Sequence, residues 1–197
     1  ALDGRVAGLG SFPAHVGTGF EVPSTPAALW CWLRGDDRGE LLHRMRLLQG
    51  ALSPAFSLDR IIDAFQYGAS LDLTGYEDGT ENPTGEEASQ VAVIRGQGEG
   101  MDGSTFVAVQ QWVHDLDRFE SFAPTEQDEV FGRRKSDNEE MDDAPPSAHV
   151  KRTAQESFQP EAFVLRRSMP WSNGPHSGLV FVPFGNSLPP FEALLNR

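Results

Sequence analysis

Residues 105–113, Thr-Phe-Val-Ala-Val-Gln-Gln-Trp-Val, are the segment of this chain with the strongest β-strand character. β-Branched and aromatic residues at this density favour a strand that packs against a core. Three apolar side chains follow at helical spacing, and they predict a helix: Leu116, Phe119 and Phe122. Two more strands are expected at 162–165 and 179–184, and a second helix starts at Pro190. The order is therefore strand, helix, strand, strand, helix.

That order is the split βαβ, or ferredoxin-like, pattern. Upstream, residues 27–33 read as a buried strand, 61–73 as extended chain and 91–94 as a brief strand. The helix between the first two has a single apolar face and ends at Pro54: Leu41, Leu42, Met45, Leu48 and Leu52. We therefore expect an α+β fold of tandem ferredoxin-like units around an antiparallel sheet. Residues 1–74 would form the back half of an incomplete first unit, and 75–197 the second unit.

Composition excludes several classes of partner and of metal site. The chain has 197 residues and a net charge of −13, which argues against nucleic acid and anionic membranes as partners. No apolar run is long enough to span a bilayer and no signal peptide is visible, so we expect a cytoplasmic protein. A single cysteine, Cys31, excludes an internal disulfide and a cysteine-built zinc site. The chain starts without Met and stops within a helix, so we expect a segment truncated at both ends.

Two glycine-rich stretches differ in what they indicate. Residues 98–103 match the G-x-G-x-x-G fingerprint, but a strand follows where dinucleotide binding needs a helix, so a hairpin loop is expected. Residues 75–83 read Gly-Tyr-Glu-Asp-Gly-Thr-Glu-Asn-Pro, with three carboxylates beside glycines. Taken alone, this stretch indicates turn chemistry, or a backbone that approaches a ligand closely.

Isolated features elsewhere have both structural and functional interpretations. His149 follows a proline-rich loop, where a lone histidine is commonly a surface or structural residue. Arg166 ends an apolar strand, a position that suits a nearby anionic group. The acidic stretch 126–143 is typical of a solvated face, although it could also attract cationic donors such as manganese.

These segments together resemble the dye-decolourising peroxidases. The 75–83 stretch is similar to the G-x-x-D-G signature of that family, and its extended form is similar to the bacterial B-type branch. Ser147-Ala148-His149 resembles the segment that carries the proximal haem ligand, and residues 165–170 resemble the distal-arginine segment. The resemblance runs from about residue 16 to the end of the chain.

The resemblance implies a peroxidase with noncovalent haem b, in which His149 is the axial ligand of the iron. Asp78 would move the peroxide proton, and Arg166 would stabilise the charge that develops on the leaving oxygen. Further cofactor-binding positions implied by the likeness are Gly79, Thr80, Glu81, Arg166, Ser168 and Phe181. Hydrogen peroxide and a small-molecule reductant, such as a dye or a phenolic, would be the substrates. Electrons could pass through Trp112, Trp171 or Tyr76, although each could equally be a packing residue.

Two other functions stay open at this stage. One is a haem-binding or haem-handling protein with little peroxidase turnover, and the other is a noncatalytic ferredoxin-like interaction domain. We expect a homo-oligomer. The visible C-terminus gives no support for a nanocompartment shell as a partner.

Overall fold

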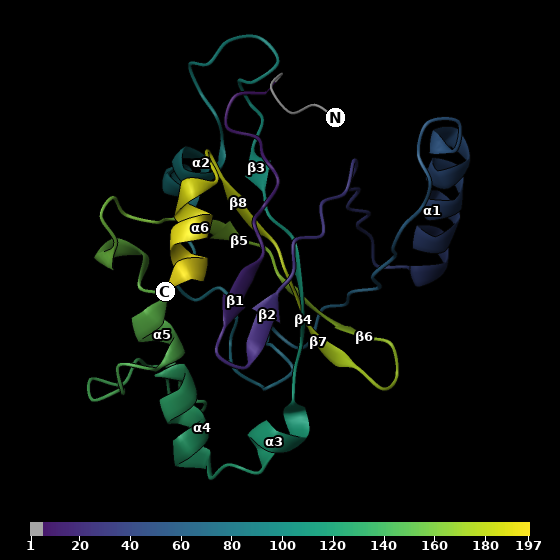
Figure 1. The fold of residues 1–197 in the computed structure, drawn as a ribbon. Helices are drawn as coiled ribbons and strands as arrows, with labels where there is room; N and C mark the ends of the chain where they lie inside the picture. The colour runs from purple at the N-terminus through teal and green to yellow at the C-terminus, as the bar shows by residue number, and fades with distance from the viewer. Residues whose placement is uncertain (1–5) are drawn as a thin grey trace. The chain divides into compact units, whose positions relative to one another are not determined.

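The computed structural model describes residues 6–197, shown in Figure 1. The chain divides into two compact units, one up to Ile62 and one from Asp63 to Arg197. None of the helices in the described part of the chain is both long and apolar enough to cross a bilayer.

The first unit contains a short hairpin and one helix. Strands β1 (His15–Gly17) and β2 (Phe20–Val22) pair antiparallel. Helix α1 (Arg38–Leu52) begins where the Asp37 side chain accepts a hydrogen bond from the Glu40 amide at 2.9 Å. This confirms the helix expected before Pro54. None of its residues is buried, so its stability draws on capping and helix propensity more than on packing.

Residues 27–33 are not a strand, contrary to expectation. They have no regular secondary structure and are mostly exposed; Trp30, for example, keeps 43% of its surface accessible. An apolar run becomes a strand only where another strand supplies its hydrogen bonds, and among the described residues none pairs with this one.

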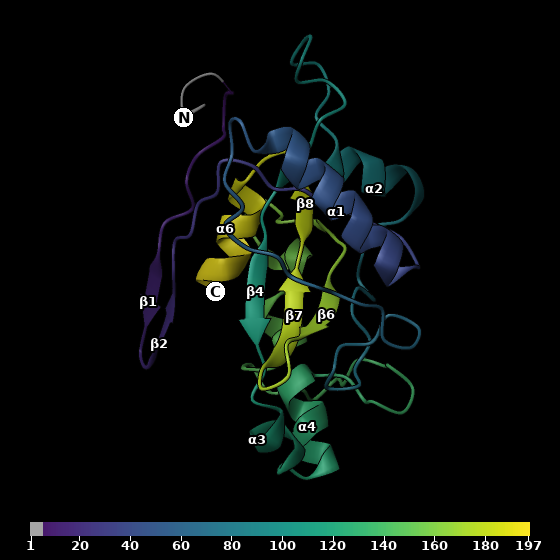
Figure 2. The ribbon, with the colours of Figure 1, turned by 90° about the vertical axis from the view of Figure 1, so that its right-hand side faces the viewer.

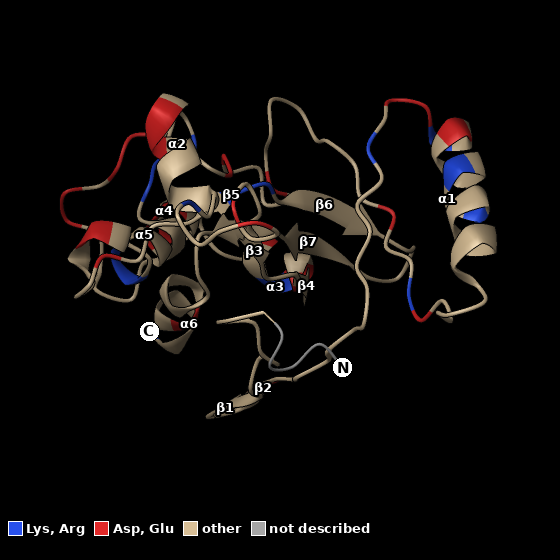
Figure 3. Cartoon of the chain, turned by 90° about the horizontal axis from the view of Figure 1, so that it is seen from above, with Lys and Arg blue, Asp and Glu red and all other residues tan. Residues whose placement is uncertain are grey.

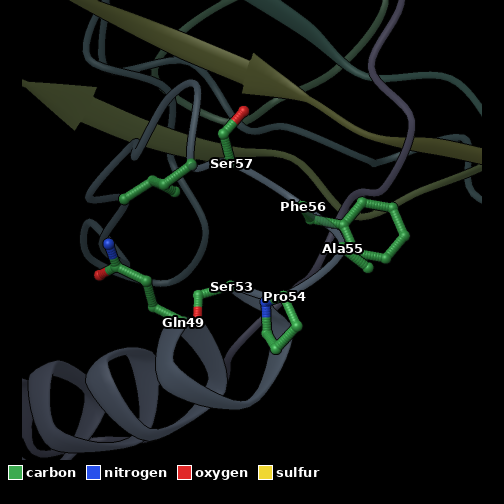
Figure 4. A pocket seen from close by; sticks show the side chains of 7 residues that line it. Gln49, Ser53, Pro54, Ala55, Phe56 and Ser57 are labelled. Atoms are coloured by element: carbon green, nitrogen blue, oxygen red, sulfur yellow. The ribbon is translucent and has the colours of Figure 1, made fainter.

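A surface depression lies just beyond α1, in the same unit (Figure 4). None of the residues singled out for chemistry lines it. Its lining residues are Gln49, Ser53, Pro54, Ala55, Phe56, Ser57 and Leu58.

The second unit holds two three-stranded antiparallel sheets, in the orders β3-β8-β5 and β4-β7-β6. Figure 2 shows β4, β7 and β6 side by side. The mixed α+β class with antiparallel pairing is therefore confirmed. The strands are β3 (Phe106–Val107), β4 (Gln110–Val113), β5 (Leu165–Arg166), β6 (Met169–Ser172), β7 (Ser177–Phe181) and β8 (Pro183–Gly185).

Two expected strands are each divided between these sheets. The 105–113 segment becomes β3, which pairs with β8, and β4, which pairs with β7. The 179–184 segment likewise becomes β7 and β8, and Pro183 begins β8. Proline has no amide hydrogen, so the ladder is interrupted there and the chain passes from one sheet to the other. Strand β6 lies outside the strands expected from the sequence, because Pro170 at its second position is unfavourable within a strand.

Helices cover the sheets and close the unit. α2 and α6 both pack against β8, and α4 contacts α5 (Figure 1). Glu86 and Glu87 lie in the first turn of α2, red in Figure 3, where negative charge is favourable to the helix dipole. The helices are α2 (Gly85–Ala92), α3 (Leu116–Glu120), α4 (Pro124–Phe131), α5 (His149–Arg152), a 3₁₀ turn (Gln155–Ser157) and α6 (Pro189–Asn196).

One further strand expectation is wrong and one loop expectation is confirmed. Residues 91 and 92 are the last turn of α2, so 91–94 is not a strand. The 98–103 stretch is a loop closed by a hairpin-like pair, in which the Ile94 amide donates to the Ser104 carbonyl and the Gly103 amide to the Ile94 carbonyl. Strand β3 follows it, without the helix N-terminus that a dinucleotide would need.

Candidate functional site

The 75–83 stretch contains the second arm of a tight turn, which pairs with residues 70 and 71. Leu71 and Glu77 face each other across an antiparallel bridge, and the Asp78 amide donates to the Ser70 carbonyl at 3.1 Å. Gly75 has φ +84°, and a Cβ there would lie 2.6 Å from the Lys135 ammonium nitrogen. Both facts favour glycine at this position, as the turn requires.

Asp78 is a half-buried carboxyl in a polar cluster. Burial raises its pKa, the positive charge of Arg166 acts in the opposite direction, and the negative charge of Asp72 raises it further. The Ser168 hydroxyl faces the Asp78 carboxyl and lowers its pKa, although it makes no hydrogen bond of normal geometry among the described residues. A carboxyl so placed can exchange a proton more readily near neutrality than a solvated aspartate.

Arg166 projects from the end of β5 beside Asp78. Its guanidinium Nε is buried and has no hydrogen-bond partner among the described residues. Burial lowers its pKa, and the negative charges of Asp78 and Glu81 oppose that effect. Buried polar atoms are nearly always paired in proteins, so an unpaired guanidinium nitrogen beside an unpaired serine hydroxyl points to a ligand-binding position.

His149 is the first residue of α5. The edge of its ring meets the Phe131 ring at a centroid distance of 6.3 Å, and Phe131 in turn stacks on Tyr76 at 4.0 Å. The side chain keeps accessible surface, yet desolvation by the surrounding atoms is the main cause that lowers its pKa, and the charge of Arg166 adds to it. A lowered pKa favours the neutral imidazole, which is the form that binds a metal.

The other cofactor-lining residues expected from the sequence are placed less uniformly. The Thr80 hydroxyl accepts a hydrogen bond from the side-chain amide of Asn138 at 2.9 Å, and the Glu81 carboxylate pairs with Arg133. These two side chains are thus engaged with the 133–138 segment. Phe181 stacks on Phe191 of α6, with ring centroids 6.3 Å apart.

The charge of Arg166 and the Ser168 hydroxyl both act on the Asp78 carboxyl, and the charge of Arg166 also acts on His149, whose ring contacts that of Phe131. Of the electron-relay candidates, Trp171 is buried and donates to the Trp112 carbonyl at 2.8 Å. The Tyr76 hydroxyl donates to Asp128 at 2.5 Å.

Sequence reasoning missed three supporting residues. Asp72 is buried and acts electrostatically on Asp78, Asn82 bonds the backbone of Arg166, and Gln155 bonds the backbone of Val164. Asn82 lies inside the quoted 75–83 stretch, so that stretch contained a signal for it. Nothing in the sequence around Gln155 marks it.

Comparison with known proteins agrees with this fold. The mixed α+β unit with antiparallel sheets has a ferredoxin-like fold. The family model "Dyp-type peroxidase, C-terminal" matches residues 69–197. The chain belongs to the Dyp-type peroxidase family.

Similar full-length proteins extend beyond this sequence. A dye-decolorizing peroxidase of Rhodococcus erythropolis is 30% identical over 98% of this chain and 58% of its own length. One from Mycobacterium tuberculosis is 30% identical over 85% of this chain and 51% of its own. The chain therefore spans little more than half the length of these relatives.

Solved structures show the same fold. A dyp-type peroxidase protein from Shewanella oneidensis superposes with a TM-score of 0.92 at 28% identity, over 98% of this chain and 64% of its own. A variant of DypB from Rhodococcus jostii RHA1, solved in complex with heme, has a TM-score of 0.84 at 27% identity, over 97% of this chain and 63% of its own.

Proposed function

We propose that this chain is the core of a haem-dependent peroxidase that reduces hydrogen peroxide and oxidises dyes, phenolics or other one-electron donors. The observation that carries the proposal is the buried Arg166 guanidinium, whose Nε has no hydrogen-bond partner among the described residues and whose charge acts on both Asp78 and His149. Residues 75–197 would form the haem-binding unit, and residues 1–74 the back half of the first unit.

The residues present fit a haem. An imidazole with a depressed pKa is a suitable iron ligand, and the buried Nε of Arg166 is a donor with no acceptor among the described residues. Gly79 presents backbone without a side chain in the same loop. His149 would hold the iron, and Gly79, Thr80, Glu81, Ser168 and Phe181 would border the cofactor.

When bound, the haem supplies the redox chemistry of peroxide reduction. Asp78 would accept a proton from hydrogen peroxide and donate it to the oxygen that leaves as water, since its raised pKa suits both transfers. Arg166 would stabilise the negative charge that develops on the departing oxygen, because its guanidinium stays cationic at any working pH.

The experiment is a haem titration of the 197-residue chain followed by visible spectroscopy. We expect a Soret band to appear at a stoichiometry of one haem per chain, to shift on addition of peroxide, and dye to be bleached. Asp78→Asn should retain the band and lose the peroxide reaction. A band that peroxide leaves unchanged would support haem handling instead, and absence of any band would contradict the proposal for this chain.

A cytoplasmic location and a homo-oligomeric state are further parts of the proposal. The net charge of −13 and the absence of long apolar helices among the described residues are compatible with both. Cell fractionation and light scattering on the natural protein would test them.

A further inference from the structure

β5 is an edge strand, and its two sides are bonded differently. It lies at the end of the β3-β8-β5 sheet and pairs with β8 alone. On the β8 side, the Arg167 amide donates to the Val182 carbonyl at 2.9 Å. Because backbone groups alternate along a strand, the amide and carbonyl of Arg166 point to the opposite, strand-free side.

The Asn82 side chain occupies that side. Its Oδ1 accepts a hydrogen bond from the Arg166 amide at 2.8 Å, and its Nδ2 donates to the Arg166 carbonyl at 3.0 Å. One carboxamide thus satisfies both main-chain groups of a single residue, as a neighbouring strand would. The two bonds constrain the position and the orientation of the Arg166 backbone.

The backbone of Asn82 belongs to the turn that directly follows Asp78. The Asn82 backbone N–H donates to the Gly79 carbonyl at 2.9 Å and closes this turn. A Cβ at Gly79 would lie 2.5 Å from Asn82 Nδ2, so the carboxamide fits only because residue 79 is glycine. The turn of residues 79–82 therefore connects Asp78 to the Arg166 backbone through short, directional contacts.

A second carboxamide, this one buried, serves the neighbouring position on the same edge. Gln155 accepts a hydrogen bond from the Val164 amide at 2.8 Å and donates to the Glu81 carbonyl at 3.4 Å. It makes no bond to Arg166 in the described structure. The edge therefore offers two side-chain amides of the same chemistry, of which one bonds Arg166.

We propose that Asn82 is a positioning residue that sets the Arg166 guanidinium against the Asp78 carboxyl. This inference rests on the proposed function, since it assigns the residue that fixes the position of the Arg166 guanidinium relative to the Asp78 carboxyl. Asn82 acts through Arg166 and does not touch the substrate. Misplacement of a catalytic group by about 1 Å can reduce a rate by roughly 10²-fold, so the position of the guanidinium affects turnover.

The test compares two near-isosteric substitutions, Asn82→Leu and Gln155→Met. Each removes one carboxamide from the same strand edge, half-buried at Asn82 and buried at Gln155, so each lowers stability, but only the first releases Arg166. In the haem-loaded protein, we expect Asn82→Leu to reduce kcat for peroxide by about 10- to 100-fold with a smaller change in KM. Gln155→Met, which leaves both bonds between Asn82 and Arg166 in place, should change kcat much less than Asn82→Leu does.

A second readout needs no haem. The pKa of Asp78 is measured by carbon NMR on protein labelled at aspartate carboxyls, with the signal assigned by its loss in Asp78→Asn. The positive charge of Arg166 lowers this pKa, so moving that charge away should raise it further. We expect the rise in Asn82→Leu and none in Gln155→Met.

The outcomes separate the inference from the proposed function. If the parent chain fails to react with peroxide, the proposed function fails and the NMR comparison still decides on Asn82. An unchanged Asp78 pKa in Asn82→Leu, or equal changes in both variants, would overturn the positioning role. Should Asn82→Leu fail to fold, Asn82→Ser keeps one hydrogen-bonding group and should show a smaller shift in the same direction; no shift there also overturns the inference.

Discussion

Oδ1 of Asp72 lies 2.8 Å from Nε2 of His114, and this pair lies beside the turn that carries Asp78. Asp72 is buried, and its other carboxylate oxygen accepts hydrogen bonds from the backbone and the hydroxyl of Thr74. Asp72 and Asp78 stand diagonally on opposite arms of the turn, so the charge of one acts on the other.

The first prediction concerns acid stability. Burial raises the Asp72 pKa, but the bonds from His114 and Thr74 lower it by more, so the pKa in the folded protein is below 3.8. A depressed pKa contributes stability above the unfolded value, and that stability is lost as the pH falls through the folded value. Asp72→Asn should lower the free energy of unfolding at pH 7 by about 1–3 kcal/mol.

Urea unfolding of the two proteins at several pH values checks this. The difference between parent and Asp72→Asn should shrink as the pH falls from about 4 towards 2, below the unfolded pKa of roughly 3.9. A difference that stays constant over this range would show that the Asp72 charge is not what stabilises the fold.

The second prediction separates stability from activity at Asp78. Burial raises the Asp78 pKa, so the folded protein favours the protonated carboxyl. The stability gained from this protonated form is present below the unfolded pKa and is lost as the pH rises through the folded pKa. At pH 7, Asp78→Asn should therefore be at least as stable as the parent. Its reaction with peroxide should be slower by roughly 10²- to 10⁴-fold.

Thermal unfolding and stopped-flow spectroscopy on the same preparations provide the two measurements. A variant that is clearly less stable at pH 7 and equally reactive would contradict both the electrostatic description and the role of Asp78.

The third prediction tests the axial ligand. His149→Ala should weaken haem binding by roughly tenfold or more, because the protein loses a coordinate bond that neighbouring contacts cannot replace. Added imidazole should restore part of the Soret intensity. His176→Ala is the matched control, since His176 lies in the exposed turn between β6 and β7 and has no place in the site. Equal affinities for haem in all three proteins would remove His149 from the ligand position.

The fourth prediction isolates steric fit at Gly79 from backbone strain. Gly79 and Gly100 have nearly the same φ, +86° and +87°, but only at Gly79 would a Cβ meet another atom, Asn82 Nδ2 at 2.5 Å. Gly100→Ala should cost about 1–2 kcal/mol for its left-handed backbone. Gly79→Ala should lower the free energy of unfolding by more than Gly100→Ala does, and it should also reduce the reactivity with peroxide. Equal losses of unfolding free energy in the two variants would show that the contact with Asn82 has no effect.

Local sequence was sufficient for several elements. The apolar face and the terminal Pro54 defined α1, and the prolines at 189 and 190 marked the start of α6. The 75–83 stretch was identified because its carboxylates and glycines are contiguous in the chain. These features depend on interactions within a few residues, which a sequence displays directly.

Tertiary structure decided the rest, because strands depend on partners that the sequence does not name. Residues 27–33 are apolar but unpaired among the described residues and form no strand, whereas residues 169–172 form β6 despite Pro170 because β7 lies beside them. The site follows the same rule. Composition and motif nominated Asp78, His149 and Arg166 one at a time, but only the folded chain sets the pKa of each through burial and the charge of Arg166. The carboxamide of Asn82 became significant only once β5 proved to be an edge strand with free backbone groups.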